Sequence, residues 1–144
     1  MRFIGLLKAD KDSEASTPPS RELMEKMGTF MEEITRAGVL LATDGLQPSS
    51  KGKRVRVDGG KVTVTDGPFT ESKELIASYA LFQTKTIDEA VDWTARFLKV
   101  LGSGECEIRP IYEATDFPAD VFPPEEAARE EKTRTKMRKN ARKR

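Results

Sequence analysis

The chain has 144 residues, with 25 Lys and Arg against 24 Asp and Glu, no His and a single Cys. This length suits one compact domain. The segment from Lys132 to Arg144 holds 8 basic and no acidic residues, which leaves 17 basic and 24 acidic residues before it. The net charge of +1 therefore divides into a body of −7 and a tail of +8, and contact with nucleic acid is expected only through the tail.

The missing histidine excludes several kinds of site. Imidazole bases, His-containing zinc or iron sites and Ser-His-Asp triads cannot form. One cysteine excludes an intramolecular disulfide and a four-thiolate metal site, and we expect no bound metal and no cofactor. No segment has the roughly 18 consecutive apolar residues of a membrane helix, and no signal peptide pattern is present. We therefore expect a cytoplasmic protein without membrane contact.

The first part of the chain predicts a strand, a helix and a second strand. The apolar run from Arg2 to Ala9 is typical of a central strand. After a polar connection, Thr17 and the two prolines that follow it predict a helix start. Apolar residues at steps of three or four then continue to Ala37, and Gly38 ends the helix. Val39 to Ala42 follows as a short buried strand.

A valine-rich hairpin comes next, and the alternation of side chains along its two strands predicts the register. If Gly59 and Gly60 form a two-residue turn, valines pair with valines on one face and arginines with threonines on the other. We expect the valine face to lie on the core or on a partner subunit, and the arginine face in water. The predicted pairs are Val55 with Val64, Val57 with Val62, Arg54 with Thr65 and Arg56 with Thr63.

The second half predicts a strand, a helix and a last strand. Leu75 to Gln83 is the strand, and a T-x-x-E capping box opens the helix from Ile87 to Leu101. The last strand, Glu105 to Glu113, contains Pro110, so we expect it to end or bulge there or to lie at an edge. The first of these strands also has small residues that let a helix or a ligand approach closely: Ala77, Ser78 and Ala80.

This order of elements is an α+β, ferredoxin-like βαββαβ pattern with an inserted hairpin. Two helices cover only one face of such a sheet, so we expect a second copy to cover the other face in a homodimer. The predicted domain spans residues 1–114, and residues 115–144 form a proline-containing linker and a basic tail. Within the tail, Glu125 to Ala141 has helix-forming composition but few apolar residues, which leaves a solvated helix or disorder open.

The segment from Thr65 to Glu74, TDGPFTESKE, resembles the signature of the DGPF family, a branch of the YCII-related proteins. Segments 37–40 (AGVL), 45–48 (GLQP) and 107–110 (EIRP) extend the resemblance to about residues 1–115. It implies a dimeric α/β barrel, in which two ferredoxin-like sheets pack face to face. Some short YCII-related proteins, a dehydrochlorinase among them, are thought to use a His and Asp pair. That His would align near Met27, so the pair cannot be carried over to this chain.

The candidate site residues surround the signature. We expect a cleft that binds a small polar or anionic molecule, bordered by Asp66, Gly67, Glu71, Lys73, Glu74 and Arg109. Asp66 and Asp44 are the candidate acids or bases of a cofactor-independent lyase or isomerase, in which burial would raise the carboxylate pKa.

Structural alternatives stay open for this signature. Asp-Gly-Pro is also ordinary turn chemistry, and Arg109 could instead pair with Asp66 or a glutamate of the signature. The alternative to an enzyme is a binding or adaptor protein that contacts nucleic acid or another macromolecule through its basic tail.

Overall fold

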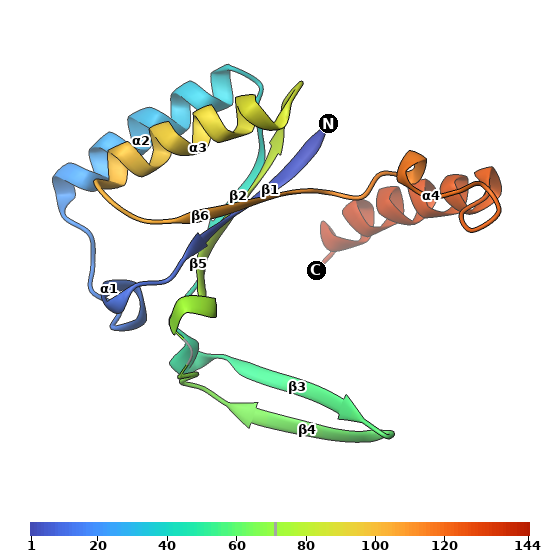
Figure 1. The fold of residues 1–144 in the computed structure, drawn as a ribbon, viewed down its shortest axis with the longest axis horizontal. Coiled ribbons are helices and arrows are strands. Elements are labelled where there is room, and N and C mark those ends of the chain that lie inside the picture. Colours follow the sequence, from blue (N-terminus) through green and yellow to red (C-terminus); the bar gives the residue numbers. More distant parts are fainter. Residues whose placement is uncertain (71) are drawn as a thin grey trace. The chain divides into compact units, whose positions relative to one another are not determined.

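The computed structural model describes residues 1–70 and 72–144, so Glu71 of the predicted ligand-binding set lies outside the described residues. The chain divides into two compact units, Met1–Ile111 and Tyr112–Arg144. The first unit is α+β and contains a four-stranded antiparallel sheet in the order β2-β5-β1-β6, which is the ferredoxin-like arrangement (Figure 1). The strands are β1 (Arg2–Lys8), β2 (Leu40–Gly45), β5 (Ile76–Gln83) and β6 (Cys106–Pro110).

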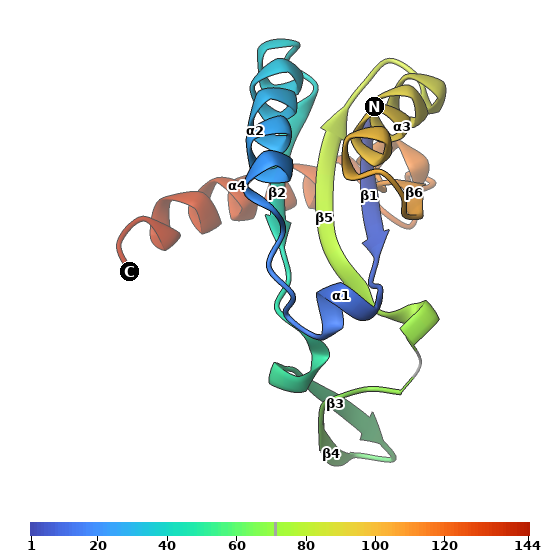
Figure 2. The same ribbon diagram turned by 90° about the vertical axis from the view of Figure 1, so that its left-hand side faces the viewer.

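The last strand ends at Pro110 and lies at an edge of the sheet, as the sequence predicted. Two helices, α2 (Arg21–Arg36) and α3 (Ile87–Leu101), lie side by side over one face of the sheet (Figures 1 and 2). A short helix, α1 (Lys11–Glu14), occupies the connection after β1 where only polar chain was expected. Asp10 caps it by accepting a 2.8 Å hydrogen bond from the Ser13 amide.

The N-terminal caps of α2 and α3 test the two predicted helix starts. The Ser20 hydroxyl accepts a 3.1 Å bond from the Leu23 amide, so α2 begins after Ser20 and the predicted start at Thr17 is wrong. The free amides of the first turn lie beyond the two prolines, within reach of Ser20. For α3 the prediction is confirmed, because Thr86 Oγ1 accepts a 3.2 Å bond from the Glu89 amide.

The hairpin of β3 (Lys53–Asp58) and β4 (Lys61–Asp66) forms a separate two-stranded sheet. Its register is the one predicted, with Val57 opposite Val62, and Gly59 and Gly60 have φ of +55° and +82°. The four valine side chains are 55% to 69% exposed. The expectation that they lie on the core of this chain is therefore wrong, because within residues 1–70 and 72–144 the hairpin strands pair only with each other. A partner subunit on this face stays a prediction.

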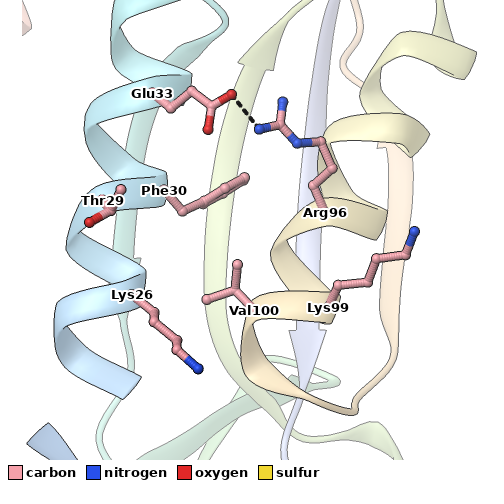
Figure 3. A pocket seen from close by; sticks show the side chains of 7 residues that line it. All are labelled: Lys26, Thr29, Phe30, Glu33, Arg96, Lys99 and Val100. Atoms are coloured by element: carbon pink, nitrogen blue, oxygen red, sulfur yellow. Dashed lines mark hydrogen bonds and ion pairs between the residues drawn. The ribbon is translucent and has the colours of Figure 1, made fainter. Parts of the chain in front are cut away.

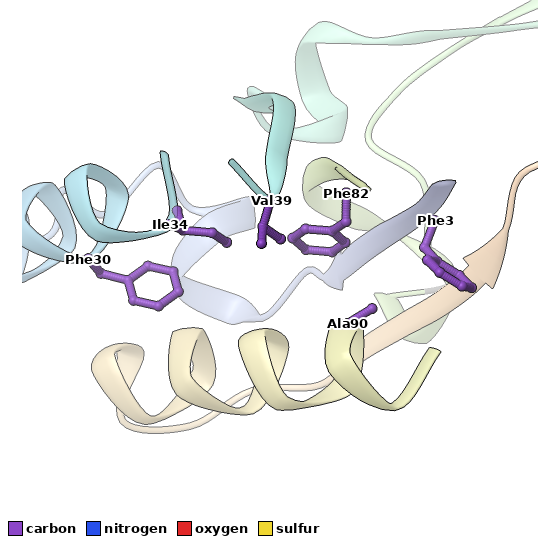
Figure 4. Close-up of a cluster of buried hydrophobic side chains, with 6 residues drawn as sticks. All are labelled: Phe3, Phe30, Ile34, Val39, Phe82 and Ala90. Atoms are coloured by element: carbon purple, nitrogen blue, oxygen red, sulfur yellow. The ribbon is translucent and has the colours of Figure 1, made fainter. Parts of the chain in front are cut away.

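The core lies between the sheet and the two helices (Figure 4). Phe3, Ile34 and Ala90 are at most 2% exposed. Gly5 allows this packing, because a Cβ atom there would lie only 2.9 Å from the ring of Phe82. Short 3₁₀ helices occupy three connections: η1 (Ser49–Lys51), η2 (Ser72–Glu74) and η3 (Ala114–Asp116).

The second unit consists of an aromatic linker and a helix. The Phe117 ring lies between those of Tyr112 and Phe122, at centroid distances of 4.9 Å and 5.8 Å, and is tilted to both. Helix α4 (Pro124–Ala141) follows, so most of the basic tail is helical. This helix has no buried residue. In the part of the chain that the structure describes, no helix combines the length and apolarity needed to cross a membrane.

Candidate functional site

The DGPF turn is held by hydrogen bonds within the first unit. The Gly67 amide donates to the Gly52 carbonyl at 3.0 Å, and a Cβ at Gly67 would lie 1.7 Å from the Ser49 carbonyl oxygen. The Phe69 amide donates to Ser49 Oγ at 3.1 Å, and this hydroxyl donates to Glu14 Oε2 at 2.5 Å. The turn therefore joins the hairpin, η1 and α1, a structural role that needs no ligand.

The other predicted ligand residues lie on several elements. Asp66 ends β4 and forms an exposed ion pair with Lys53. Lys73 and Glu74 are exposed in η2, whereas Arg109 is exposed on β6, the edge strand. Within residues 1–70 and 72–144, no hydrogen bond or ion pair links Arg109 to the turn. The structure thus joins Asp66 and Gly67 in one turn and places Arg109 elsewhere.

A cavity of about 520 Å³ lies between the sheet and the two helices. Asp44 of the two candidate acids is among its lining residues. The helices contribute Met27, Phe30, Met31, Ile34, Trp93, Thr94, Phe97 and Leu101, and the strands contribute Gly5, Leu7, Leu40, Thr43, Asp44, Gly45, Ser78, Tyr79, Ala80, Phe82 and Cys106.

The helix side of this cavity is apolar and aromatic. The Phe30 ring lies 6.2 Å from the rings of both Trp93 and Phe97, measured between centroids. Met27 and Met31 add flexible thioethers that adapt to the shape of a bound molecule. Such walls suit an apolar or aromatic ligand.

Polar groups of the cavity gather where β2 pairs with β5. Thr43 Oγ1 donates a 2.7 Å bond to the Tyr79 carbonyl. The hydroxyl of Ser78 has no hydrogen-bond partner among the described residues, so it is available to a ligand. Burial, followed by the charge of Glu105, raises the pKa of the Cys106 thiol. The thiol is therefore protonated near neutral pH and a poor nucleophile.

Asp44 and Tyr79 form a polar pair on neighbouring strands. They lie opposite one another in the β2–β5 register, and the Tyr79 hydroxyl donates a 2.7 Å bond to Asp44 Oδ2. This bond and the negative charge of Asp44 raise the pKa of Tyr79. Side chains alternate along a strand, so the pair points to the sheet face opposite the helices, the face shared by Leu6 and Leu81. We call this face the open face of the sheet. Asp44 and Tyr79 therefore belong to strand segments that line the cavity, while their side chains lie on the open face.

A second groove, of about 450 Å³, lies on the outer side of α2 and α3 (Figure 3). Arg96 forms an ion pair with Glu33 across it, and the Arg96 guanidinium lies 4.5 Å from the Trp93 ring centroid. This contact joins the two helices above Trp93 and Phe30, two rings that also line the cavity.

The YCII-related domain matches residues 1–115 of the chain. The chain belongs to the YCII-related family. An uncharacterized protein of Rhizobium meliloti (strain 1021) is 27% identical over 107 residues, which is 72% of this chain and 86% of that protein.

A solved structure of 5-chloro-2-hydroxyhydroquinone dehydrochlorinase (TftG) from Burkholderia phenoliruptrix AC1100, in complex with 2,5-dihydroxybenzoquinone, aligns with a TM-score of 0.43 and 11% identity. The alignment covers 82% of this chain and 100% of the dehydrochlorinase chain.

Sequence reasoning missed Thr43 and Trp93 as cavity residues. One signal did indicate the site, since the small residues Ser78 and Ala80 predicted a close approach to β5, and both line the cavity. Among residues 1–70 and 72–144, no group of three or more His, Cys, Asp or Glu side chains is placed to hold a metal ion.

Proposed function

We propose that this YCII-related protein binds a small molecule in the cavity between its helices and its sheet. The observation that carries the proposal is a space of about 520 Å³ with mainly apolar walls and a few polar groups, among them Thr43 and Ser78. The sequence favoured a polar or anionic ligand at the DGPF turn, but the Asp66 side chain and the Gly67 and Phe69 amides already have partners in β3 and in the η1 segment. The cavity favours a mainly apolar molecule with one polar end.

A fluorescent probe of that shape, 1-anilinonaphthalene-8-sulfonate, tests the proposal. The wild-type protein should bind it saturably with one site per chain. Thr43→Trp places an indole where the cavity borders β2 and should weaken binding at least about tenfold, in keeping with loss of the apolar contact area. Thr65→Trp, on the exposed hairpin, is the matched control. Equal binding by the two variants would place the probe outside the cavity.

A lyase or isomerase reaction would rest on Asp44, on the open face of the sheet next to the cavity. Of the two candidate acids, Asp44 borders the cavity, and Tyr79 holds its carboxylate in place. In the reaction, the carboxylate accepts a proton from a carbon of a molecule bound on the open face of the sheet, where Asp44 and Tyr79 point. The electron pair left behind forms a double bond, and either a leaving group departs or the proton returns at another carbon.

Proton exchange tests this chemistry before a substrate is known. Metabolites that raise the melting temperature of the protein are incubated with it in D2O, and NMR follows deuterium incorporation at carbon. Asp44→Asn should abolish incorporation, whereas Asp66→Asn should leave it unchanged. Incorporation that survives in Asp44→Asn would remove Asp44 as the base.

The same proposal includes a homodimer. The helices cover one face of the sheet, and the other face carries the half-buried apolar residues Ile4, Leu6 and Leu81. A second copy packed there would bury these side chains together with Asp44 and Tyr79.

A further inference from the structure

Three lysines of helix α4 and one in the turn after it share one face. Lys132, Lys136 and Lys139 follow at steps of four and three, which places them within about 60° of one another on a helix of 3.6 residues per turn. Lys143 continues the spacing in the turn after the helix. All four are exposed, and none has an ion-pair partner in the described part of the chain. We call this set the lysine stripe.

A second set of basic residues runs along another face. Arg134, Arg138 and Arg142 follow at steps of four residues, about 130° around the helix from the lysine stripe. We call this set the arginine stripe. Arg134 bonds to Glu130 at 2.6 Å, whereas the other two have no ion-pair partner among the described residues.

The last turns of α4 lack both acidic residues and an apolar face. No acidic residue follows Glu131 in the sequence, so the two stripes form a positively charged rod. Met137 is the only large apolar residue of this helix, and α4 buries no side chain. A helix that binds within a membrane surface needs a broad apolar face, which α4 does not have.

We propose that the C-terminal half of α4 lies in the major groove of duplex DNA. A helix is about 10–12 Å across with its side chains, and the groove of B-form DNA is about 12 Å wide. Two basic stripes separated by about 130° can meet the phosphates on both walls of a groove, whereas a flat anionic surface meets one stripe at a time. The contacts are to phosphates, so binding is insensitive to sequence and strongly dependent on salt. This inference is independent of the cavity proposal.

Three full-length variants with the same net charge test it. Lys132→Gln/Lys136→Gln/Lys139→Gln removes the lysine stripe, and Arg134→Gln/Arg138→Gln/Arg142→Gln removes the arginine stripe. The control replaces three exposed basic residues of the first unit that have no ion-pair partner among the described residues: Arg36→Gln, Lys51→Gln and Lys61→Gln. Fluorescence anisotropy measures binding to a mixed-sequence DNA duplex over a range of salt concentrations, and vesicles of phosphatidylglycerol are the second probe.

The wild-type protein should bind the duplex at about 50 mM salt. Each stripe variant should bind at least about tenfold more weakly, and the slope of log K against log salt should fall in magnitude by about 2 to 3. The control should stay within about twofold of wild type. No binding by the wild type, an equal loss in the control, a loss in only one stripe variant, or tighter binding to the vesicles would overturn the proposal. The stripe variants should fold, because α4 buries no side chain.

Discussion

The hydrogen bond from Tyr79 to Asp44 can be measured by titration. Asp44 raises the pKa of Tyr79, first through the hydrogen bond and then through its charge. The chain has two tyrosines, so Tyr112→Phe leaves Tyr79 as the only one. In that background we expect phenolate absorbance to appear above the ordinary pKa of about 10. Adding Asp44→Asn should return the pKa of Tyr79 to the ordinary value.

The same bond sets the sign of a pH effect on stability. The pKa of Tyr79 is higher in the folded chain than in the unfolded chain, so above pH of about 10 the unfolded chain loses this proton first. The stabilising contribution is therefore complete below that pH and lost as the pH rises through the folded pKa. A Tyr79 pKa that does not change in Asp44→Asn would show that the bond does not form in solution.

Two glycines give opposite predictions. Gly67→Ala should lower the free energy of unfolding by about 1–3 kcal/mol, because the new Cβ would lie 1.7 Å from the Ser49 carbonyl oxygen. Gly28 lies inside α2 with nothing within 4 Å of a Cβ, so Gly28→Ala should raise it by about 0.5–1 kcal/mol. Urea unfolding measures both. A stable Gly67→Ala protein would show that the turn can move away from η1.

At the scale of elements, two substitutions test which residue caps the start of α2, Ser20 or Thr17. Ser20→Ala should cost about 1 kcal/mol of unfolding free energy, because the Leu23 amide loses its 3.1 Å partner. Thr17→Ala should change stability by less than about 0.5 kcal/mol, since Thr17 lies before the prolines and outside the first turn. The reverse ranking in thermal or urea unfolding would restore Thr17 as the cap.

Sequence was sufficient where local chemistry decides the structure. The Gly59-Gly60 turn and the alternation of valines fixed the hairpin register, and the Thr86 cap and Gly102 bounded α3. The start of α2 was missed because Thr17 and Ser20 are both good caps, and only the path of the chain after the prolines separates them.

The cavity was beyond local reasoning because its wall comes from two helices and four strands. Met27 and Cys106 are far apart in the sequence, and they meet only once both helices pack on the sheet. The small residues of β5 indicated a close approach but did not distinguish a helix from a ligand. The signature turn attracted the functional prediction, whereas its backbone contacts serve the junction with η1.

On the scale of the whole molecule, the boundary between acidic and basic charge falls inside the second unit. Residues 1–111 hold 16 basic and 17 acidic residues, residues 112–131 hold 1 basic and 7 acidic residues, and 8 basic residues follow in residues 132–144. The basic charge therefore lies on the exposed end of α4 and the turn after it. A ligand cavity in one unit and a charged rod in the other need no common residue. Small-molecule binding and DNA binding can therefore be measured separately, with variants that leave the other unit intact.

The open face of the sheet gives the last prediction. Two chains of 16.1 kDa should sediment together at micromolar concentration, with twice that mass. Leu6 lies opposite Tyr79 and Glu107 on the open face, so Leu6→Lys would place a charge in the proposed interface and should give a monomer. Met24→Lys is the control, because Met24 is 58% exposed on α2, away from the sheet. A monomeric wild-type protein would contradict the dimer and leave the open face of the sheet, with Asp44 and Tyr79, in water.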